Sequence, residues 1–129
     1  MDSLFTKIIH GEVSSYKVYE DEYVYAFLDI NQFHQGKILI VPKVHIDHFF
    51  DIPAPYYQAL FEASKILAPV IKQVFGSERV AMVIEGLEIA HAHIKLFPIN
   101  KAGDIGHEPM STLDHQSMLD IQNKIVTHL

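Results

Sequence analysis

The sequence predicts an α+β fold in which helices pack against a mostly antiparallel sheet. Two kinds of pattern indicate this class. Short runs of aromatic and β-branched residues are bounded by polar turns, and longer segments carry apolar residues at helical spacing. The 129 residues contain no internal repeat, low-complexity tract or Gly/Ser linker, so we expect one domain that spans residues 1–129.

The first third of the chain predicts a short helix followed by three strands. Residues 3–10 begin with a capping serine, carry apolar residues at helical spacing and end before a glycine, as an amphipathic helix does. Residues 16–19 and 23–28 are rich in aromatic and β-branched residues, and the acidic residues between them indicate a tight turn. Residues 37–41 are a lysine followed by four apolar residues and then a proline, which predicts a buried strand.

The rest of the chain predicts a long helix, two strands and a C-terminal helix. Residues 51–76 carry apolar side chains at helical spacing, and Pro69 should kink this helix because proline lacks the backbone donor. Residues 79–84 and 90–97 are the next predicted strands. Residues 111–128 carry an apolar stripe, with an acidic residue early and basic residues late, which favours a helix.

The composition restricts the possible functions. Ten basic against sixteen acidic residues give a net charge of −6, which argues against binding to duplex nucleic acid or to anionic membranes. A local basic site for one small phosphate ester stays possible. The absence of cysteine excludes disulfides, thiolate zinc sites, iron–sulfur clusters and a cysteine nucleophile. There is no apolar run of about 20 residues and no signal pattern, so the expected location is cytoplasmic.

Nine histidines are an unusually high number, and two of them lie in one predicted strand. Alternate side chains of a strand share a face, so residues 90–97 would present His91, His93 and Lys95 in a row, roughly 7 Å apart. The residues between them are apolar and would face the core. A neutral imidazole is a competent nucleophile toward phosphorus. Alternatively, His45 could join the two histidines as metal ligands, or the strand could be a solvated edge. The spacing alone does not rank these readings.

The sequence around these histidines resembles the signature of the histidine triad (HIT) family. Residues 91–98 read His-Ala-His-Ile-Lys-Leu-Phe-Pro, and the family pattern alternates three histidines with apolar residues. Four further blocks resemble the family's N-terminal segments in order and spacing: residues 4–12, 19–21, 26–31 and 39–45. The resemblance therefore covers roughly residues 3–98, whereas the predicted helix at 111–128 has no firm counterpart.

The resemblance implies an α+β homodimer that needs no cofactor and binds a purine nucleotide or nucleotide conjugate. Such proteins cleave nucleoside phosphoramidates, dinucleoside polyphosphates or related conjugates at the α-phosphate. By its position in the motif, His93 would attack phosphorus and carry a covalent nucleotidyl intermediate that water resolves. His91 would orient the site, Lys95 would contact phosphate, and His45 would be an outlying fourth member.

The resemblance also implies a pocket for the base and the ribose. Asp29 would accept hydrogen bonds from the ribose hydroxyls, which a carboxylate does well. Backbone groups near Gly86 and Ile89 would take part in binding the phosphate. The other residues expected to line the pocket are apolar: Leu4, Phe5, Ile8, Phe27 and Ile30.

The chain departs from the family pattern at three places. Lys95 stands at the third triad position, and with a reference pKa of about 10.4 a lysine is a poor proton shuttle, so we expect weaker turnover or a need for good leaving groups. Many bacterial relatives hold a zinc ion through N-terminal cysteines. Ser3 and Thr6 stand at those positions here, so we expect no bound metal. Residues 83–90 are shorter than the Gly-rich, Ser-containing loop of the phosphoramidase branch.

Two alternatives to the hydrolase therefore stay open. The first is a nucleotide-binding protein of this fold with weak or no catalysis, because Lys95 occupies a triad position. The second is a metal-dependent hydrolase with His45, His91 and His93 as ligands.

Overall fold

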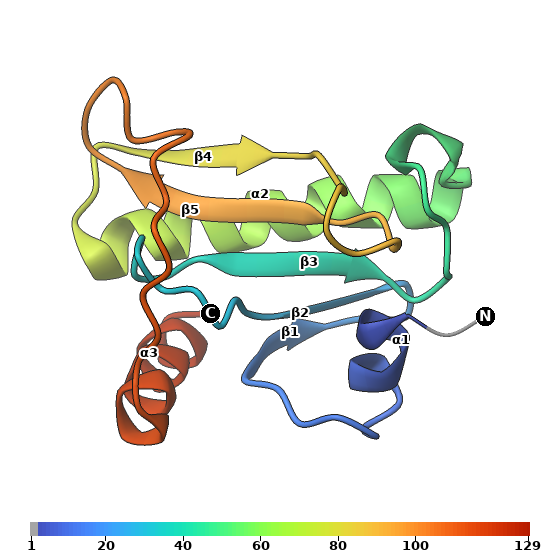
Figure 1. The fold of residues 1–129 in the computed structure, drawn as a ribbon, viewed down its shortest axis with the longest axis horizontal. Coiled ribbons are helices and arrows are strands. Elements are labelled where there is room, and N and C mark those ends of the chain that lie inside the picture. Colours follow the sequence, from blue (N-terminus) through green and yellow to red (C-terminus); the bar gives the residue numbers. More distant parts are fainter. Residues whose placement is uncertain (1–2) are drawn as a thin grey trace.

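The computed structural model describes residues 3–129 and contains a five-stranded sheet (Figure 1). Its strands are β1 (Lys17–Glu20), β2 (Val24–Leu28), β3 (Ile38–Pro42), β4 (Arg79–Val83) and β5 (Ile94–Ile99). Their order in the sheet is β1-β2-β3-β5-β4, and each neighbouring pair is antiparallel. The predicted α+β class is confirmed.

Helices cover both faces of the sheet and one of its edges. They are α1 (Leu4–Ile9), the short 3-10 helix η1 (Phe49–Asp51), α2 (Ala54–Phe75) and α3 (His115–Thr127). α2 lies along one face, α1 lies on the other, and α3 packs beside β1 (Figure 1). None of the helices within residues 3–129 has the length and apolarity that a membrane span requires.

The long helix α2 continues through Pro69 as one element of 22 residues. It begins later than predicted, because the preceding residues form η1 and Pro53 at the N-cap has an extended ψ of 156°. The helix ends at Gly76, which adopts the left-handed conformation and donates its N–H to the carbonyl of Lys72.

The main core lies between the sheet and α2. Alternate residues of the central strands face α2 and are completely shielded from solvent, for example Ile38, Ile40 and Ile94. Leu60 and Leu67 of α2 pack against them. A second, smaller cluster lies on the opposite face, where α1 packs on β2 and β3: Phe5, Ile8, Tyr25, Phe27, Leu39 and Val41.

The prediction that a strand begins at residue 90 is wrong, because β5 begins at Ile94. The last β3–β5 pair joins Ile40 to Ile94. Two positions further along β3, opposite Ala92 in the same register, lies Pro42, which has no N–H to continue the ladder. Instead, Ala92 donates its N–H to the carbonyl of Ile46 at 2.8 Å. Ala92 still packs into the core, so the predicted alternation of side chains is present without the strand.

The C-terminal helix also starts later than predicted, at His115 rather than at residue 111. Asp114 caps it by accepting the N–H of Ser117 at 2.7 Å. The segment 107–111, which we call the strap, instead crosses the connection between β2 and β3. Ser111 donates its N–H to the Asn31 side chain and accepts the N–H of Gln32.

The connection between β2 and β3 is held by hydrogen bonds and packs against the end of α2. Gly36 has a φ of +101°, and a Cβ atom there would lie 2.5 Å from a ring carbon of Phe75, so only glycine fits. The buried side chain of Gln32 accepts the N–H of Gly36 and donates to the carbonyls of Asp29 and Lys37. This network of hydrogen bonds fixes the positions of the backbone at Asp29 and Lys37, whose charged side chains lie at the two ends of the connection.

Candidate active site

A cavity of about 440 Å³ opens on the face of the sheet that carries α1. Its walls come from α1, the end of β2, the start of β3 and β5, the loop between β4 and β5, and the strap. All eight residues expected to bind substrate line it: Leu4, Phe5, Ile8, Phe27, Asp29, Ile30, Gly86 and Ile89. A wider, more open groove between β1 and α3 contains none of them and none of the histidines.

His93 lies on the cavity wall immediately before β5. Its Nδ1 is 2.8 Å from the carbonyl oxygen of His91, so this nitrogen carries the proton and donates it, and Nε2 is the unprotonated nitrogen. Nε2 of His93 has no hydrogen-bond partner. Because every fully buried side-chain nitrogen and oxygen of the described residues has a partner, Nε2 is not fully buried and is open to the cavity. The ring of Phe5 packs edge-on against the imidazole, with centroids 5.0 Å apart.

Burial lowers the pKa of His93 below the ordinary histidine value of 6.5. The hydrogen bond to the His91 carbonyl opposes this shift, the ammonium of Lys95 adds to it, and the carboxylates of Asp29 and Glu85 oppose it. Desolvation wins because charging a buried imidazole sacrifices its hydration. The imidazole is therefore neutral at pH 7, which is the state that a nucleophile needs.

His91 is buried more deeply than His93, and it does not line the cavity. Its Nε2 lies 3.0 Å from the carbonyl oxygen of Pro42 and donates to it, and its Nδ1 accepts the hydroxyl of Ser3 at 2.7 Å. Burial lowers the pKa of His91 as well. Because both ring nitrogens are engaged, His91 is placed to hold the backbone that orients His93.

His45 lies behind His91 and outside the cavity wall. The two rings stack with centroids 5.1 Å apart and an angle of 19° between their planes, and His45 Nε2 contacts the carbonyl of Ala90 at 2.6 Å. Within residues 3–129, no three metal-binding side chains are grouped to hold an ion. A metal site at His45, His91 and His93 would also require His91 to give up one of its two hydrogen bonds. The geometry thus gives no support to the metal-dependent alternative.

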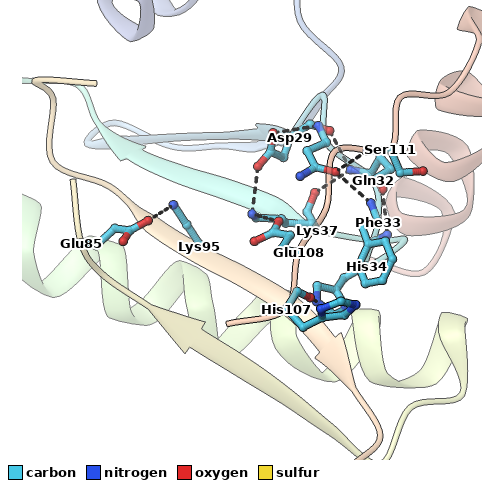
Figure 2. A network of polar contacts seen from close by, with 12 residues as sticks. Asp29, Gln32, Phe33, His34, Lys37, Glu85, Lys95, His107, Glu108 and Ser111 are labelled. Atoms are coloured by element: carbon cyan, nitrogen blue, oxygen red, sulfur yellow. Dashed lines mark hydrogen bonds and ion pairs between the residues drawn. The ribbon is translucent and has the colours of Figure 1, made fainter. Parts of the chain in front are cut away.

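Lys95 lines the cavity next to His93 and is paired with an acidic residue (Figure 2). Its Nζ lies 2.7 Å from Oε1 of Glu85, in the loop that follows β4. This hydrogen bond and the positive charge lower the pKa of Glu85. Glu85 is not among the residues predicted from the sequence, because nothing in the loop's composition indicates that it faces Lys95.

A second ammonium group on the cavity wall was also missed. Lys37 Nζ lies 3.1 Å from Oδ2 of Asp29 and is also bonded to Oε1 of Glu108 (Figure 2). A lysine at the head of an apolar run was the available signal for Lys37. Glu108 carried no signal, since it lies 71 positions away in the chain.

The fold and the site define a class: an α+β protein whose cavity combines a neutral, backbone-anchored histidine with paired lysines and apolar walls. The family model of the HIT domain matches residues 10–101, which is most of the chain. This protein belongs to the HIT family.

Individual relatives are similar over nearly the whole chain. Protein hit of Bacillus subtilis is 32% identical over 126 residues, which cover 93% of this chain and 87% of that protein. The adenosine 5'-monophosphoramidase HNT1 of Saccharomyces cerevisiae is 31% identical over 129 residues, covering 98% and 82%. The crystal structure of a hypothetical histidine triad nucleotide-binding protein of Sulfolobus tokodaii superposes with a TM-score of 0.84 at 25% identity, covering 96% and 89%. The likeness thus extends beyond residue 100, where the sequence alone offered no counterpart.

Proposed function

We propose that the protein is a nucleotide hydrolase or transferase that cleaves a nucleoside phosphoramidate, dinucleoside polyphosphate or related conjugate at the α-phosphate. One observation carries the proposal: His93 donates through Nδ1 to a backbone carbonyl and leaves Nε2 open to a cavity. The cavity volume of about 440 Å³ suits a small-molecule ligand. The similarity to a yeast adenosine 5'-monophosphoramidase supports a nucleotide as that ligand.

In the proposed reaction, His93 Nε2 attacks the α-phosphorus. A phosphorus–nitrogen bond to the imidazole forms as the bond to the leaving group breaks. The leaving amine or phosphate departs with the electron pair and takes up a proton from water, and the hydrolytic second step returns one proton to water. Water then attacks the nucleotidyl-His93 intermediate and releases the nucleotide and the imidazole. Lys95 stabilises the charge on the phosphate oxygens. His91 and His45 keep the backbone around His93 in place.

The rest of the cavity would bind the nucleoside. Leu4 and Ile30 are apolar yet largely exposed at the cavity, which suits contact with a planar base. Phe5 and Phe27 pack edge-on to one another behind them, and Asp29 would accept from the ribose. A homodimer and a cytoplasmic location, which the resemblance implies, stay predictions.

The Lys95–Glu85 pair favours a second candidate, a nucleotide-binding protein with weak catalysis. The carboxylate of Glu85 already binds the ammonium of Lys95 at 2.7 Å, so a phosphate group must compete with Glu85 for this ammonium. Lysine at the third triad position is also a poor proton donor to a leaving group. Under this alternative, Lys95→His raises the rate of AMP release, whereas an unchanged rate on every nucleotide substrate would show that the lysine does not limit turnover.

Incubation with adenosine 5'-phosphoramidate tests the proposal. AMP release, together with an adenylyl adduct that mass spectrometry locates on His93 after acid-free quenching, is the expected result. His93→Ala should abolish both, and His48→Ala, at an exposed histidine outside the cavity, should abolish neither. Binding without AMP release would favour the second candidate. Activity that chelators remove would restore the metal-dependent alternative, and absence of both binding and turnover would refute a nucleotide function.

A further inference from the structure

Glu85 and Lys95 form an ion pair on the cavity wall, apart from the pair between Lys37 and Asp29 (Figure 2). Lys95 lies on β5, two positions after His93, and Glu85 lies in the loop that follows β4. Lys95 Nζ donates to Glu85 Oε1 at 2.7 Å, whereas Oε2 makes no hydrogen bond or ion pair with another residue of the described part of the chain. The side chain of the lysine is 14% exposed and that of the glutamate is 45% exposed. One carboxylate oxygen is therefore held in place, and the other is accessible to a molecule in the cavity.

In the proposed reaction, the second step requires a group that accepts a proton from water. His93 Nδ1 donates its hydrogen to the carbonyl of His91, so the imidazole leaves phosphorus as a neutral ring and takes up no proton. The attacking water, in contrast, must lose a proton as its oxygen bonds to phosphorus. A base that is positioned in the cavity would therefore accelerate this step.

The neighbouring histidines, His91 and His45, cannot serve as this base. His91 donates through Nε2 to the carbonyl of Pro42 and accepts the hydroxyl of Ser3 at Nδ1, so both of its ring nitrogens are engaged. His45 stacks behind His91 and does not line the cavity. The ammonium of Lys95 has no lone pair. The ionised acceptors that are left on the cavity wall are carboxylates.

The position of Lys95 distinguishes one of the carboxylates on the cavity wall. These carboxylates belong to Asp29, Glu85, Glu88 and Glu108. Asp29 and Glu108 are both bonded to Lys37, and Glu88 makes no ion pair with another described residue. Lys95 has three N–H donors and gives one of them to Glu85, so two donors are available to phosphate oxygens. The same ammonium can thus hold a phosphoryl group and the Glu85 carboxylate side by side.

The carboxyl group of Glu85 is in the accepting form at pH 7. The hydrogen bond from Lys95 is the largest cause that lowers its pKa below the ordinary value of 4.5, and the positive charge of Lys95 adds to this. Partial burial opposes the shift, whereas the charges of Lys37 and His93 favour it. Because the carboxylate is also accessible, a proton that it takes from water can pass on to solvent.

We infer that Glu85 is the general base of the second step, in which Oε2 binds the attacking water while Lys95 holds Oε1 and the phosphate oxygens. The water oxygen forms a bond to phosphorus, and the phosphorus–nitrogen bond breaks with its electron pair returning to His93 Nε2. The proton of the water passes to Glu85 and from there to solvent. The inference rests on the proposed function. It makes Glu85 a catalytic residue and Lys95 its positioning residue.

Single-turnover reactions test this role of Glu85. Protein in excess over adenosine 5'-phosphoramidate is quenched without acid at successive times, and mass spectrometry follows the adenylyl adduct on His93. In Glu85→Gln, the amide keeps the shape of the side chain but is not a base, so the adduct should form at close to the parent rate and decay about 10²-fold more slowly or more. With substrate in excess, this variant should release one equivalent of ammonia in a burst and then turn over slowly.

The matched control is Glu88→Gln, which removes the same charge from the same loop at a carboxylate without an ion pair. Its adduct should decay at the parent rate. Two variants test Lys95 as the positioning residue. Lys95→Met should slow the decay, because Glu85 loses the donor that holds it, and Lys95→Arg, which keeps a donor for Glu85, should decay at close to the parent rate.

The adduct distinguishes failure of this inference from failure of the proposed function. Decay at the parent rate in Glu85→Gln would overturn the inference and leave the proposed reaction standing. Equal slowing in Glu88→Gln would also overturn it, because loss of charge from the loop would then explain the effect. If neither the parent protein nor Glu85→Gln forms an adduct, the proposed reaction is refuted and the inference with it. If Glu85→Gln does not fold, the same time courses with Glu85→Ala decide.

Discussion

The face of the sheet under α2 and the face under α1 are built from alternate residues of the same strands. On β5, Ile94 and Leu96 pack under α2 in the main core, whereas Lys95 between them lines the cavity. On β3, Ile38 and Ile40 face α2, and Leu39 faces the cavity. One face therefore holds the main core, and the other combines a smaller apolar cluster with the polar side chains of the cavity. Under the proposed function, substitutions at the main core and at the cavity side chains should separate stability from activity.

The largest expected effect is that of His93→Ala, which tests whether activity can be lost with little change in stability. Loss of the attacking nitrogen should lower kcat/KM for adenosine 5'-phosphoramidate by about 10⁴-fold or more. The free energy of unfolding should change less than in a core variant, because the imidazole lies on the cavity wall. AMP release and urea unfolding measure the two quantities. A variant that retains a tenth of the activity would mean that His93 is not the nucleophile.

The converse substitution lies on the α2 face. Leu67 is completely buried between α2 and the sheet, so Leu67→Ala should lower the free energy of unfolding by about 3 kcal/mol. At a temperature where the variant is folded, its kcat/KM should stay within about twofold of the parent protein. Urea unfolding and AMP release again provide the measurements. A loss of activity as large as that of His93→Ala would mean that the two faces are not independent.

Acidic pH should separate stability from activity without any substitution, because stability should fall at a higher pH than the rate. Burial lowers the pKa of His91 and His93, so as pH falls below 6.5 these histidines take up protons in the unfolded chain but not in the folded one. The unfolded state then binds more protons, and stability falls with pH, by at most about 1.4 kcal/mol per pH unit for each histidine. The rate should fall only at lower pH, where folded His93 itself titrates.

Urea midpoints and kcat/KM measured from about pH 5 to 8 test this order of events. The His48→Ala variant should keep the same pH dependence of stability, since the side chain of His48 is exposed. A rate that declines at higher pH than stability would contradict a lowered pKa for His93.

The smallest predicted effect concerns Ser3, whose side chain links the cap of α1 to His91. Its hydroxyl oxygen accepts the N–H of Thr6 and caps α1, and the same hydroxyl contacts His91 Nδ1. Ser3→Ala should cost about 1 kcal/mol of stability and should also lower kcat, because His91 loses a partner. Thr6→Ala removes the reciprocal bond to the Ser3 N–H and the contact between the two hydroxyls, but it leaves the bond from Ser3 to His91, so it should lower stability with a smaller effect on kcat. If both variants lower kcat equally, the contact with His91 has no part in catalysis.

The sequence predicted those parts of the fold and site that depend on local pattern. The alternation of residues 91–96 placed Ala92 and Ile94 in the core, although the strand boundary was wrong. That boundary depends on Pro42 of another strand, which ends the ladder. The start of α3 was wrong for a similar reason, since Ser111 is bonded to a distant connection.

The ion pairs of the cavity could not be predicted, because each joins segments far apart in the chain. Lys37 and Glu108 meet only once the strap has crossed the β2–β3 connection, and Glu85 meets Lys95 only through the course of a loop. No periodicity encodes such contacts. Six of the eight predicted lining residues, in contrast, belong to ordered sequence blocks that resemble the family, at residues 4–12 and 26–31, and all eight surround one cavity.

The close approach of Gly36 to Phe75 has a consequence on the far side of the sheet. The ring of Phe75 at the end of α2 packs against Gly36 and so limits how closely the β2–β3 connection, which carries Asp29 and Lys37, can approach α2. Any larger residue at position 36 should displace that chain, and Asp29 and Lys37 with it, relative to His93. Under the proposed function, a hydrocarbon contact outside the cavity thus helps to fix the distance between Asp29 and His93.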